Sequence, residues 1–296
     1  MAKTITLRRR LLEYGTASLV AGTLLWAAFY RASADLGTLM SSIRMQLQMA
    51  YAIPPVDKHG VPLSQRESML SEIEHSLDQA EALAPRLAAV AEFRGFLHML
   101  RSEWRTAAAD YHRARGLDEC DIDQRDTLVF NEARMLQKAR DPEAALLVFT
   151  ANKPQLEPHL LSQCEIESAA LLHELGRDPE SLALLQGLLA GDEQDPTVLV
   201  QAGQQFEALG RLDLADTAFT RAAVYAPVVD YHRSRLKMRS GEVDKALELL
   251  QRAAKAASAE VQRLADNDRA VWQAVADDER FSKLLGPRPP AGTPAR

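Results

Sequence analysis

Residues 196–229 read PTVLVQAGQQFEALGRLDLADTAFTRAAVYAPVV, and this stretch decides the fold of the chain. Gly210 divides it into two segments in which apolar and small residues recur at three- and four-residue steps, the spacing of one face of a helix. The first face carries Leu199, Ala202, Gly203 and Phe206, and the second carries Ala215, Phe219, Ala222 and Ala223, before Pro227 closes the unit. We expect the small residues to let the two helices approach closely, while the larger ones fill the space to neighbouring helix pairs.

The same pattern recurs at three places upstream, over residues 88–121, 126–159 and 162–195. The third of these aligns without a gap, because Gly176 precedes Gly210 by 34 residues, although Ser181 stands where alanine is usual. A half unit over residues 73–85, with Leu83 in its apolar set, precedes them, and one more unit with a short first helix is expected around Gly241. Such repetition is the sequence signature of stacked helix pairs.

These units resemble the tetratricopeptide repeat, a helix–turn–helix unit of 34 residues whose copies stack on one another. The resemblance covers roughly residues 64–256 and implies an all-α fold, a solenoid of helix hairpins that takes part in protein–protein interaction. A stacked array needs a cap, and we expect a final helical pair within residues 257–285 to supply it. The Pro/Gly-rich residues 286–296 are expected to form a disordered tail.

The N-terminus has the pattern of a membrane anchor. Lys3 and Arg8–Arg10 make residues 1–10 basic, and the following residues 14–30 carry no charge. About 20 apolar residues cross a hydrocarbon core of ~30 Å, so we expect a transmembrane helix over residues 11–32. Basic residues before this span outnumber those just after it, which predicts a cytoplasmic N-terminus at a bacterial inner membrane, with the repeats in the periplasm.

Two other interpretations of this segment stay open. Ala32-Ser33-Ala34 matches the small-residue cleavage pattern of a secretory signal peptide, so a cut near Ala34 would release the chain to the periplasm. The segment could also be a buried helix of a soluble protein. The anchored and the cleaved forms send the repeats to the same compartment and differ in whether the repeats stay tethered.

Residues 33–63 are expected to form an amphipathic stem and a linker. Apolar residues recur at helical spacing from Leu36 to Ala50, and Met45 and Met49 flank this stripe. The stripe either packs against the first helix of the repeats, continues the membrane helix, or docks on another membrane subunit. Three prolines and a glycine within residues 53–63 end the helix and form the linker.

Composition and motifs argue against an enzyme and against a nucleic-acid-binding protein. The 296 residues carry 35 Lys and Arg against 41 Asp and Glu, a net charge of −6 that gives no support for binding nucleic acid. The sequence has no phosphate-binding loop and no dinucleotide, metalloprotease, hydrolase or kinase motif. We therefore expect no catalytic residue and no cofactor.

Metal and disulfide chemistry are also not expected. The acidic residues within 118–123 lack the glycine and the distal glutamate of a calcium loop, and the seven histidines show no metal-ligand spacing. Cys120 and Cys164 fall in different repeats, and sulfurs bridge when their Cα atoms lie within about 7 Å. Two free, mostly buried thiols are expected in preference to a disulfide.

A partner would bind along the concave groove that the first helices of tetratricopeptide repeats line. Carried onto this sequence, the groove positions are Glu92, Phe96 and Met99, then Phe130, Arg134, Gln137 and Lys138, then Ile166, Ala170, His173 and Glu174, and finally Val200, Gln204 and Glu207. An apolar patch beside a few charges suits an extended or helical peptide. The Lys/Asn clamp that chaperone-tail binders of this family use for a terminal carboxylate is not matched.

We therefore predict a membrane-anchored interaction scaffold, an accessory or assembly subunit of a membrane complex that faces the periplasm. Its partners are proteins of that complex, and residues 11–30 contact the lipid bilayer. The alternative is a periplasmic quality-control or secretion helper that binds client polypeptides transiently. A fixed partner stoichiometry would favour the complex subunit, and variable stoichiometry would favour the transient helper.

Overall fold

The computed structural model describes residues 35–56, 63–117, 120 and 122–285. Within these ranges the chain folds into helices joined by short turns, which confirms the predicted all-α class. The predicted transmembrane helix over residues 11–32, the cleavage pattern near Ala34 and the expected tail over residues 286–296 lie outside the described residues. Among the residues that the structure describes, no helix has both the length and the apolar character that crossing a bilayer requires.

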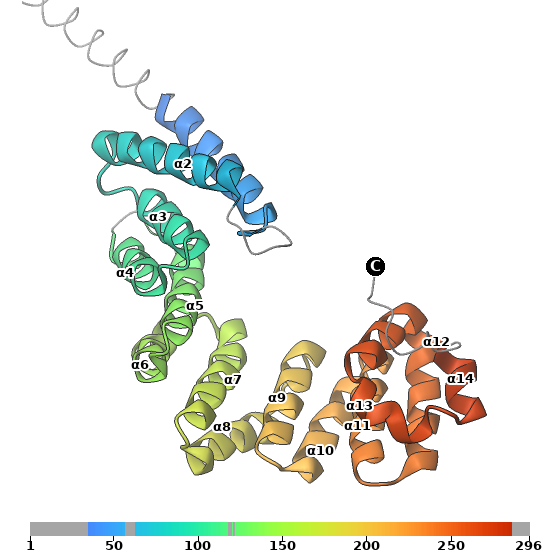
Figure 1. Ribbon diagram of the computed structural model, residues 1–296. Helices are drawn as coiled ribbons and strands as arrows, with labels where there is room; N and C mark the ends of the chain where they lie inside the picture. The colour runs from blue at the N-terminus through green and yellow to red at the C-terminus, as the bar shows by residue number, and fades with distance from the viewer. Residues whose placement is uncertain (1–34, 57–62, 118–119, 121, 286–296) are drawn as a thin grey trace, which may run out of the picture. The chain divides into compact units, whose positions relative to one another are not determined.

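The chain divides into two compact units, residues 1–148 and residues 149–296, which we call unit 1 and unit 2. The described helices of unit 1 are the stem helix (residues 35–52), α2 (Ser64–Leu83), α3 (Ala88–Leu100), α4 (Trp104–Arg115), α5 (Ile122–Lys138) and α6 (Pro142–Asn152), whose last residues belong to unit 2. Unit 2 continues with η1 (Lys153–Gln155), α7 (Pro158–Glu174), α8 (Asp178–Ala190), α9 (Pro196–Ala208), α10 (Leu212–Ala223), η2 (Pro227–Val229), α11 (Asp230–Arg239), α12 (Val243–Asn267), α13 (Arg269–Trp272), η3 (Gln273–Val275) and α14 (Glu279–Leu285). Figure 1 labels the α-helices from α2 onward.

The stem helix is part of the packed core of unit 1. Its apolar stripe, represented by Ile43 and Leu47, is buried in one cluster with Ile73 and Leu77 of α2. The stripe therefore packs against the body, as one of the three interpretations held, and it is not free to dock on another subunit. Met45 and Met49, beside the stripe, are exposed.

The half unit predicted over residues 73–85 is a longer helix than the pattern indicated. α2 begins at Ser64 and spans 20 residues, because its partner is the stem helix and its first turns also supply apolar contacts. Leu83, which matches the repeat pattern in the sequence, is 56% exposed, because it ends α2 beyond the packed stripe.

Three of the predicted repeats are packed helix pairs, α3 with α4, α7 with α8, and α9 with α10, and the other predicted repeat corresponds to the consecutive helices α5 and α6. The first helix of each ends in a turn with one residue in the left-handed region. Gly176 and Gly210 hold this position with φ of 71° each, and Gly241 holds it in the next pair with φ of 79°. In unit 1, Ser102 and Arg140 adopt the same conformation with φ of 61° and 59°. The turn geometry is thus kept even where glycine, which adopts it without strain, is absent.

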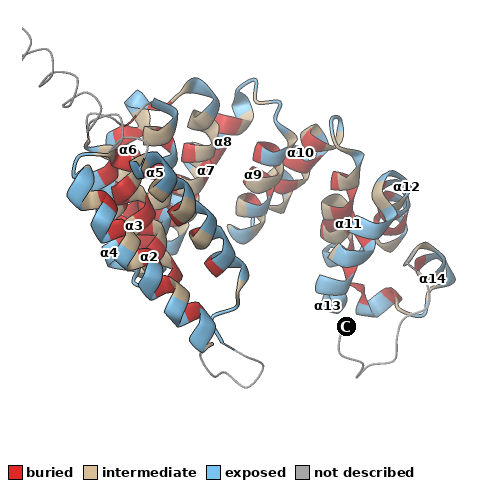
Figure 2. Cartoon of the chain, turned by 90° about the horizontal axis from the view of Figure 1, so that it is seen from above, coloured by how far each residue is buried: buried red, intermediate tan, exposed pale blue. Residues whose placement is uncertain are grey.

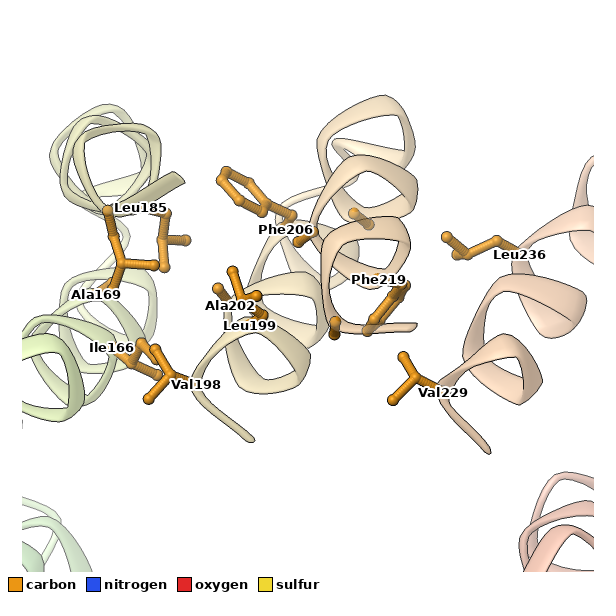
Figure 3. Close-up of a cluster of buried hydrophobic side chains, with 14 residues drawn as sticks. Ile166, Ala169, Leu185, Val198, Leu199, Ala202, Phe206, Phe219, Val229 and Leu236 are labelled. Carbon is orange, nitrogen blue, oxygen red and sulfur yellow. The ribbon is translucent and has the colours of Figure 1, made fainter. Parts of the chain in front are cut away.

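The core of unit 2 lies between neighbouring pairs. Figure 3 shows Leu199 and Phe206 of α9 on the side of Ala169 and Leu185, whereas Phe219 of α10 belongs to the side of Val229 and Leu236. Both phenylalanines are fully buried. Figure 2 shows how buried and exposed residues separate onto different sides of the helices. Each pair therefore buries apolar surface that it could not cover alone.

Two glycines let an aromatic ring rest directly on a helix backbone. A Cβ placed on Gly203 would lie 2.5 Å from Cε1 of Phe219, and one placed on Gly95 would lie 2.8 Å from Cε1 of Tyr111. Both distances are shorter than carbon atoms tolerate, so the close approach of α9 to α10, and of α3 to α4, requires glycine at these positions.

Ser181 shows how one repeat accommodates a departure from the pattern. The side chain is fully buried on α8, and its hydroxyl donates a hydrogen bond of 2.7 Å to the carbonyl oxygen of Ala169 on α7. A buried hydroxyl without such a partner would cost free energy, so this bond allows serine to replace the usual alanine.

A helical pair was expected at the C-terminal end, over residues 257–285. The backbone of α12 is non-helical at Ala257 (φ −153°, ψ 72°), so α12 consists of two helices that meet where the expected pair begins, and the second of them ends at Asn267. The residues that follow form α13, η3 and α14. Trp272 fills this cap, with ring centroids 6.0 Å from Tyr231 and 5.6 Å from Phe281.

Replacing Gly203 with alanine should lower the free energy of unfolding by about 1–3 kcal/mol, because the added methyl group overlaps the Phe219 ring. Urea unfolding of the purified chain measures the change. Gly187→Ala is the matched control, since a Cβ at this helical glycine of α8 meets nothing within 4 Å. Alanine there should stabilise by about 0.5–1 kcal/mol through helix propensity. Equal responses of the two variants would contradict the close approach.

Candidate functional site

Unit 1 contains a pocket of about 670 Å³, a volume typical of ligand sites. Its walls come from the end of the stem helix, the proline linker, the first turn of α2, and parts of α3, α4 and α5. The lining residues are Tyr51, Ala52, Ile53, Pro54, Pro55, Arg66, Phe96, Met99, Leu100, Ser102, Trp104, Tyr111, Asn131, Arg134, Met135 and Lys138.

The apolar part of the pocket is mostly aromatic and methionine side chains. Tyr51 at the end of the stem helix lies 6.0 Å from Phe96 of α3, ring centroid to ring centroid. Met99 and Trp104 are half-buried, and Tyr111 is buried against Gly95. Burial raises the pKa of Tyr111, and the nearby Glu92 and Asp110 carboxylates raise it further, so its hydroxyl stays protonated at neutral pH.

The charged part of the pocket is cationic. Arg66, Arg134 and Lys138 line it, and none of the described lining residues is acidic. Lys138 Nζ lies 5.2 Å from the centroid of the Trp104 ring, within the range of a cation–π contact. The chain as a whole has a net charge of −6 and would attract cationic groups. The positive pocket differs from it and favours binding of an anionic group.

Arg66 is the most constrained of these cations. It is 6% exposed, and its Nη2 donates a hydrogen bond of 2.7 Å to the carbonyl oxygen of Leu100 at the end of α3. Its Nη1 lies 4.0 Å from the carboxylate of Glu67, which is too long for a hydrogen bond. Its Nε is buried and has no hydrogen-bond partner among the described residues. A buried guanidinium with this little compensation is costly.

Four of the predicted groove residues meet in this pocket: Phe96, Met99, Arg134 and Lys138. Glu92 is not among the lining residues, and its carboxylate accepts a hydrogen bond of 2.6 Å from the Gln124 amide. Phe130 and Gln137 do not line the pocket either. Of the groove residues predicted in unit 1, some therefore line the pocket, and Glu92 instead takes part in a contact between helices.

In unit 2 two of the predicted groove residues are engaged inside the protein. Ile166 was predicted to face a partner, and this is wrong: it is 3% exposed and packs in the core that includes Val198 (Figure 3). The carboxylate of Glu207 accepts charged hydrogen bonds from Arg235 and Arg239 of α11, so it links neighbouring helix pairs.

The remaining predicted residues of unit 2 lie at or near the surface. His173 Nδ1 lies 2.7 Å from Oδ1 of Asp178 across the turn between α7 and α8. Val200 is partly buried against the core, and Glu174 and Gln204 are exposed. A smaller cavity of about 390 Å³ in unit 2 lies elsewhere, between α12 and α14.

Several residues of the pocket were not predicted from the sequence. Arg66 contributes the buried cation, and Trp104 and Tyr111 contribute ring surface from α4, the second helix of its pair. Pro54 and Pro55 bring the linker onto the pocket. The paired prolines could have indicated this from the sequence, because proline fixes φ and makes the linker stiff.

The cysteines and the acidic side chains offer little to a metal ion. Cys120 and Cys164 are buried thiols that are not joined in a disulfide, as predicted. Burial raises the pKa of the Cys164 thiol, which makes it a poorer metal ligand and nucleophile. Within the described parts of the chain, no three His, Cys, Asp or Glu side chains are grouped so that they could hold a metal ion.

Comparisons with known proteins give similarity in structure and none in sequence. No protein-family model matches the chain, and no curated protein matches it. It is similar to PilW, a type IV pilus biogenesis factor, at 14% identity over 82% of this chain and 98% of PilW, with a TM-score of 0.46. The quorum sensor NprR from B. thuringiensis gives 14% identity over 74% of this chain and 73% of NprR, with a TM-score of 0.46.

Cut9 in the APC/C Cut9–Hcn1 hetero-tetramer gives 13% identity over 73% of this chain, with a TM-score of 0.44, and the match spans 45% of that chain. At these identities and TM-scores, the functions of these proteins are not transferred to this chain, and the chain is not assigned to a family.

A second polar cluster, in unit 2, supports the fold around α11. The Tyr231 hydroxyl donates a hydrogen bond of 2.8 Å to Oδ2 of Asp268, and the Trp272 indole N–H donates to the same hydroxyl at 3.2 Å. His232 stacks on Phe219 with ring centroids 5.1 Å apart, and its Nδ1 is buried without a hydrogen-bond partner among the described residues. This arrangement holds a neutral imidazole.

Acidification should destabilise unit 2 through His232. Burial, with Arg235 nearby, lowers the pKa of His232 from 6.5 to about 4, although the Glu207 and Asp268 carboxylates oppose this. Between these two values the unfolded chain binds a proton that the folded chain does not, so the stability is present above pH 6.5 and is lost as the pH falls toward 4. The loss should reach about 2–3 kcal/mol.

Urea unfolding at about pH 7.5 and about pH 4.5 measures this effect. His232→Phe keeps an aromatic ring stacked on Phe219. In this variant the stability lost on acidification should be smaller than in the wild type by about 2–3 kcal/mol. His75→Gln, at an exposed histidine of α2, is the control and should keep the wild-type pH dependence. An unchanged pH dependence in His232→Phe would contradict a buried neutral imidazole.

Proposed function

We propose that this protein is an interaction module that holds a segment of a partner polypeptide in the pocket of unit 1. The single observation that carries the proposal is the pocket itself, with aromatic and methionine side chains on its walls and three cations among them. Methionine and aromatic side chains are common where a surface must fit another polypeptide. Stacked helix pairs provide such a site without a catalytic constellation.

We also propose that the module is tethered to a bacterial inner membrane, with its body in the periplasm. The basic residues 1–10 and the apolar residues 11–30 support the tether, and the charge asymmetry across them supports the orientation. In this setting the protein serves as an accessory or assembly subunit of a membrane complex. Met45 and Met49 are exposed in the second half of the stem helix and add apolar surface there.

Site-specific photocrosslinking tests the pocket. A benzophenone amino acid in place of Phe96 should yield a discrete crosslinked product of fixed stoichiometry from cells, because a bound segment lies against this side chain. The same amino acid in place of Leu147, which is 68% exposed on α6 and does not line the pocket, is the matched control.

Equal crosslinking at both positions, or none at Phe96, would argue against a partner in the pocket. A smear of many products at Phe96 would instead favour the transient helper that binds varied clients.

Fractionation tests the tether. The full chain should stay with membranes after alkaline carbonate washing, and a chain that starts at residue 35 should be released, because the apolar segment is removed. The cut keeps the stem helix, whose stripe is buried in unit 1 and whose loss would expose the core. A reporter that is active only in the periplasm, fused after Arg296, checks the orientation. A full chain that is released by carbonate would refute the anchor.

A further inference from the structure

We infer that the pocket is specific for an acidic side chain of the bound segment, and that Arg66 receives its carboxylate. This inference rests on the proposed function, since it names the chemistry of the segment that the pocket holds. Three observations carry it: the incomplete pairing of a buried guanidinium, the charges that surround the pocket, and the apolar surface beside them.

The first observation is the unused hydrogen-bonding capacity of Arg66. A guanidinium has five N–H donors in a planar fork, and the described structure gives this one a hydrogen bond to the carbonyl of Leu100. The Nε donor is buried without a partner, although the side chain lines an open pocket. A carboxylate that enters the pocket beside this side chain can neutralise the charge of the guanidinium, which a neutral ligand cannot do.

The neighbouring carboxylate of Glu67 does not fill this role. It lies 4.0 Å from Nη1, and its side chain is 56% exposed, so solvent screens it. Elsewhere in unit 1 arginines are paired more closely: Arg94 lies 2.6 Å from both Asp78 and Glu81. The Nε of Arg94 is likewise buried without a hydrogen-bond partner in the described structure, so Arg66 is set apart by the distance of its nearest carboxylate and not by its Nε.

The second observation is that the pocket gathers cations from two helices. Arg134 and Lys138 are four residues apart on α5, and both are exposed at the pocket, whereas Arg66 comes from α2. Such a field attracts an acidic segment and repels a basic one. Because the cations are spread over two elements, the pocket suits acidic side chains along a segment better than a single chain end.

The third observation is the apolar surface next to these charges. Phe96, Met99 and Trp104 are half-buried, so each still presents part of its surface. A segment that places a Leu, Phe or Trp side chain beside its acidic residue covers this surface while the carboxylate reaches Arg66. The occupant is therefore an acidic and apolar peptide segment, and not an inorganic anion alone.

Arg66 also has a structural role, because its hydrogen bond to Leu100 satisfies a carbonyl at the C-terminus of α3. A test must separate this role from carboxylate binding. Arg66→Lys keeps a positive charge that can still donate to Leu100 but removes the planar fork and its Nε. Arg134→Gln and Lys138→Met remove exposed charges and leave Arg66 in place.

The experiment selects short random peptides displayed on phage against the full chain in mild detergent. The tightest peptide is then synthesised with blocked ends, so that no terminal charge contributes, and its Kd is measured by fluorescence anisotropy. We expect Asp or Glu beside an apolar residue in the selected peptides. Changing that acid to its amide should weaken binding about tenfold or more.

The variants locate the effect. Arg66→Lys should weaken binding of the acidic peptide by about tenfold. It should also nearly abolish the difference in Kd between the acid and the amide peptide, since the variant and the amide remove the same interaction. Lys255→Met and Arg263→Gln, at exposed positions of α12 in unit 2, match the charge changes at Lys138 and Arg134 and should leave the Kd unchanged. Thermal unfolding of each variant confirms that it is folded.

NMR spectroscopy reports on Arg66 directly. The arginine Nε–Hε signal that is missing from the NMR spectrum of Arg66→Lys belongs to this residue. Binding of the acid peptide should change the chemical shift of that signal more than binding of the amide peptide does. An equal shift with both peptides would overturn the assignment of Arg66 as the carboxylate receptor.

The outcomes separate the inference from the proposed function. Peptides that bind tightly, lose affinity in Phe96→Ala and show no preference for an acidic residue overturn the inference and leave the pocket as a partner site. Peptides whose affinity does not change in Phe96→Ala bind elsewhere, and a selection that yields no peptide shows no such site. Either result overturns the proposed function and the inference with it.

Discussion

The structure depends on how closely the two helices of a pair can approach each other. Where the first helix carries glycine, the ring of an aromatic residue on the second helix lies against its backbone, as Tyr111 does at Gly95 and Phe219 does at Gly203. This contact fixes the distance and rotation of the pair, so that its other apolar residues face the next pair. In unit 1 the same contact orients Tyr111, which then forms part of the pocket wall.

The pocket arises where the regular stacking of unit 1 changes. The repeats are joined by turns of a few residues, but the stem helix and α2 are joined by a longer, proline-containing linker that lies partly on the pocket. The first turn of α2 then places Arg66 at the end of α3, where a helix C-terminus offers carbonyl oxygens. The feature that breaks the repeat pattern therefore also brings the buried cation, Arg66, to the site.

Periodicity predicted the helix pairs well, because the spacing of small and large residues and the turn glycines are local properties of the chain. It predicted less about the site, because long-range contacts decide it: Arg66 and Leu100 are 34 residues apart. Ile166 was assigned to the wrong face, because its burial depends on packing in one cluster with Val198 of the next pair, which the periodicity of α7 alone does not show. The engagement of Glu207 by arginines of α11 was likewise not visible in the pattern.

Hydrogen–deuterium exchange of the full chain, with and without the partner that crosslinking at Phe96 identifies, tests most directly whether a partner polypeptide occupies the pocket of unit 1. A bound partner should slow exchange at residues 51–53, 97–104 and 131–138, which carry most of the pocket wall. Slowed exchange confined to unit 2, with these segments unchanged, would contradict it.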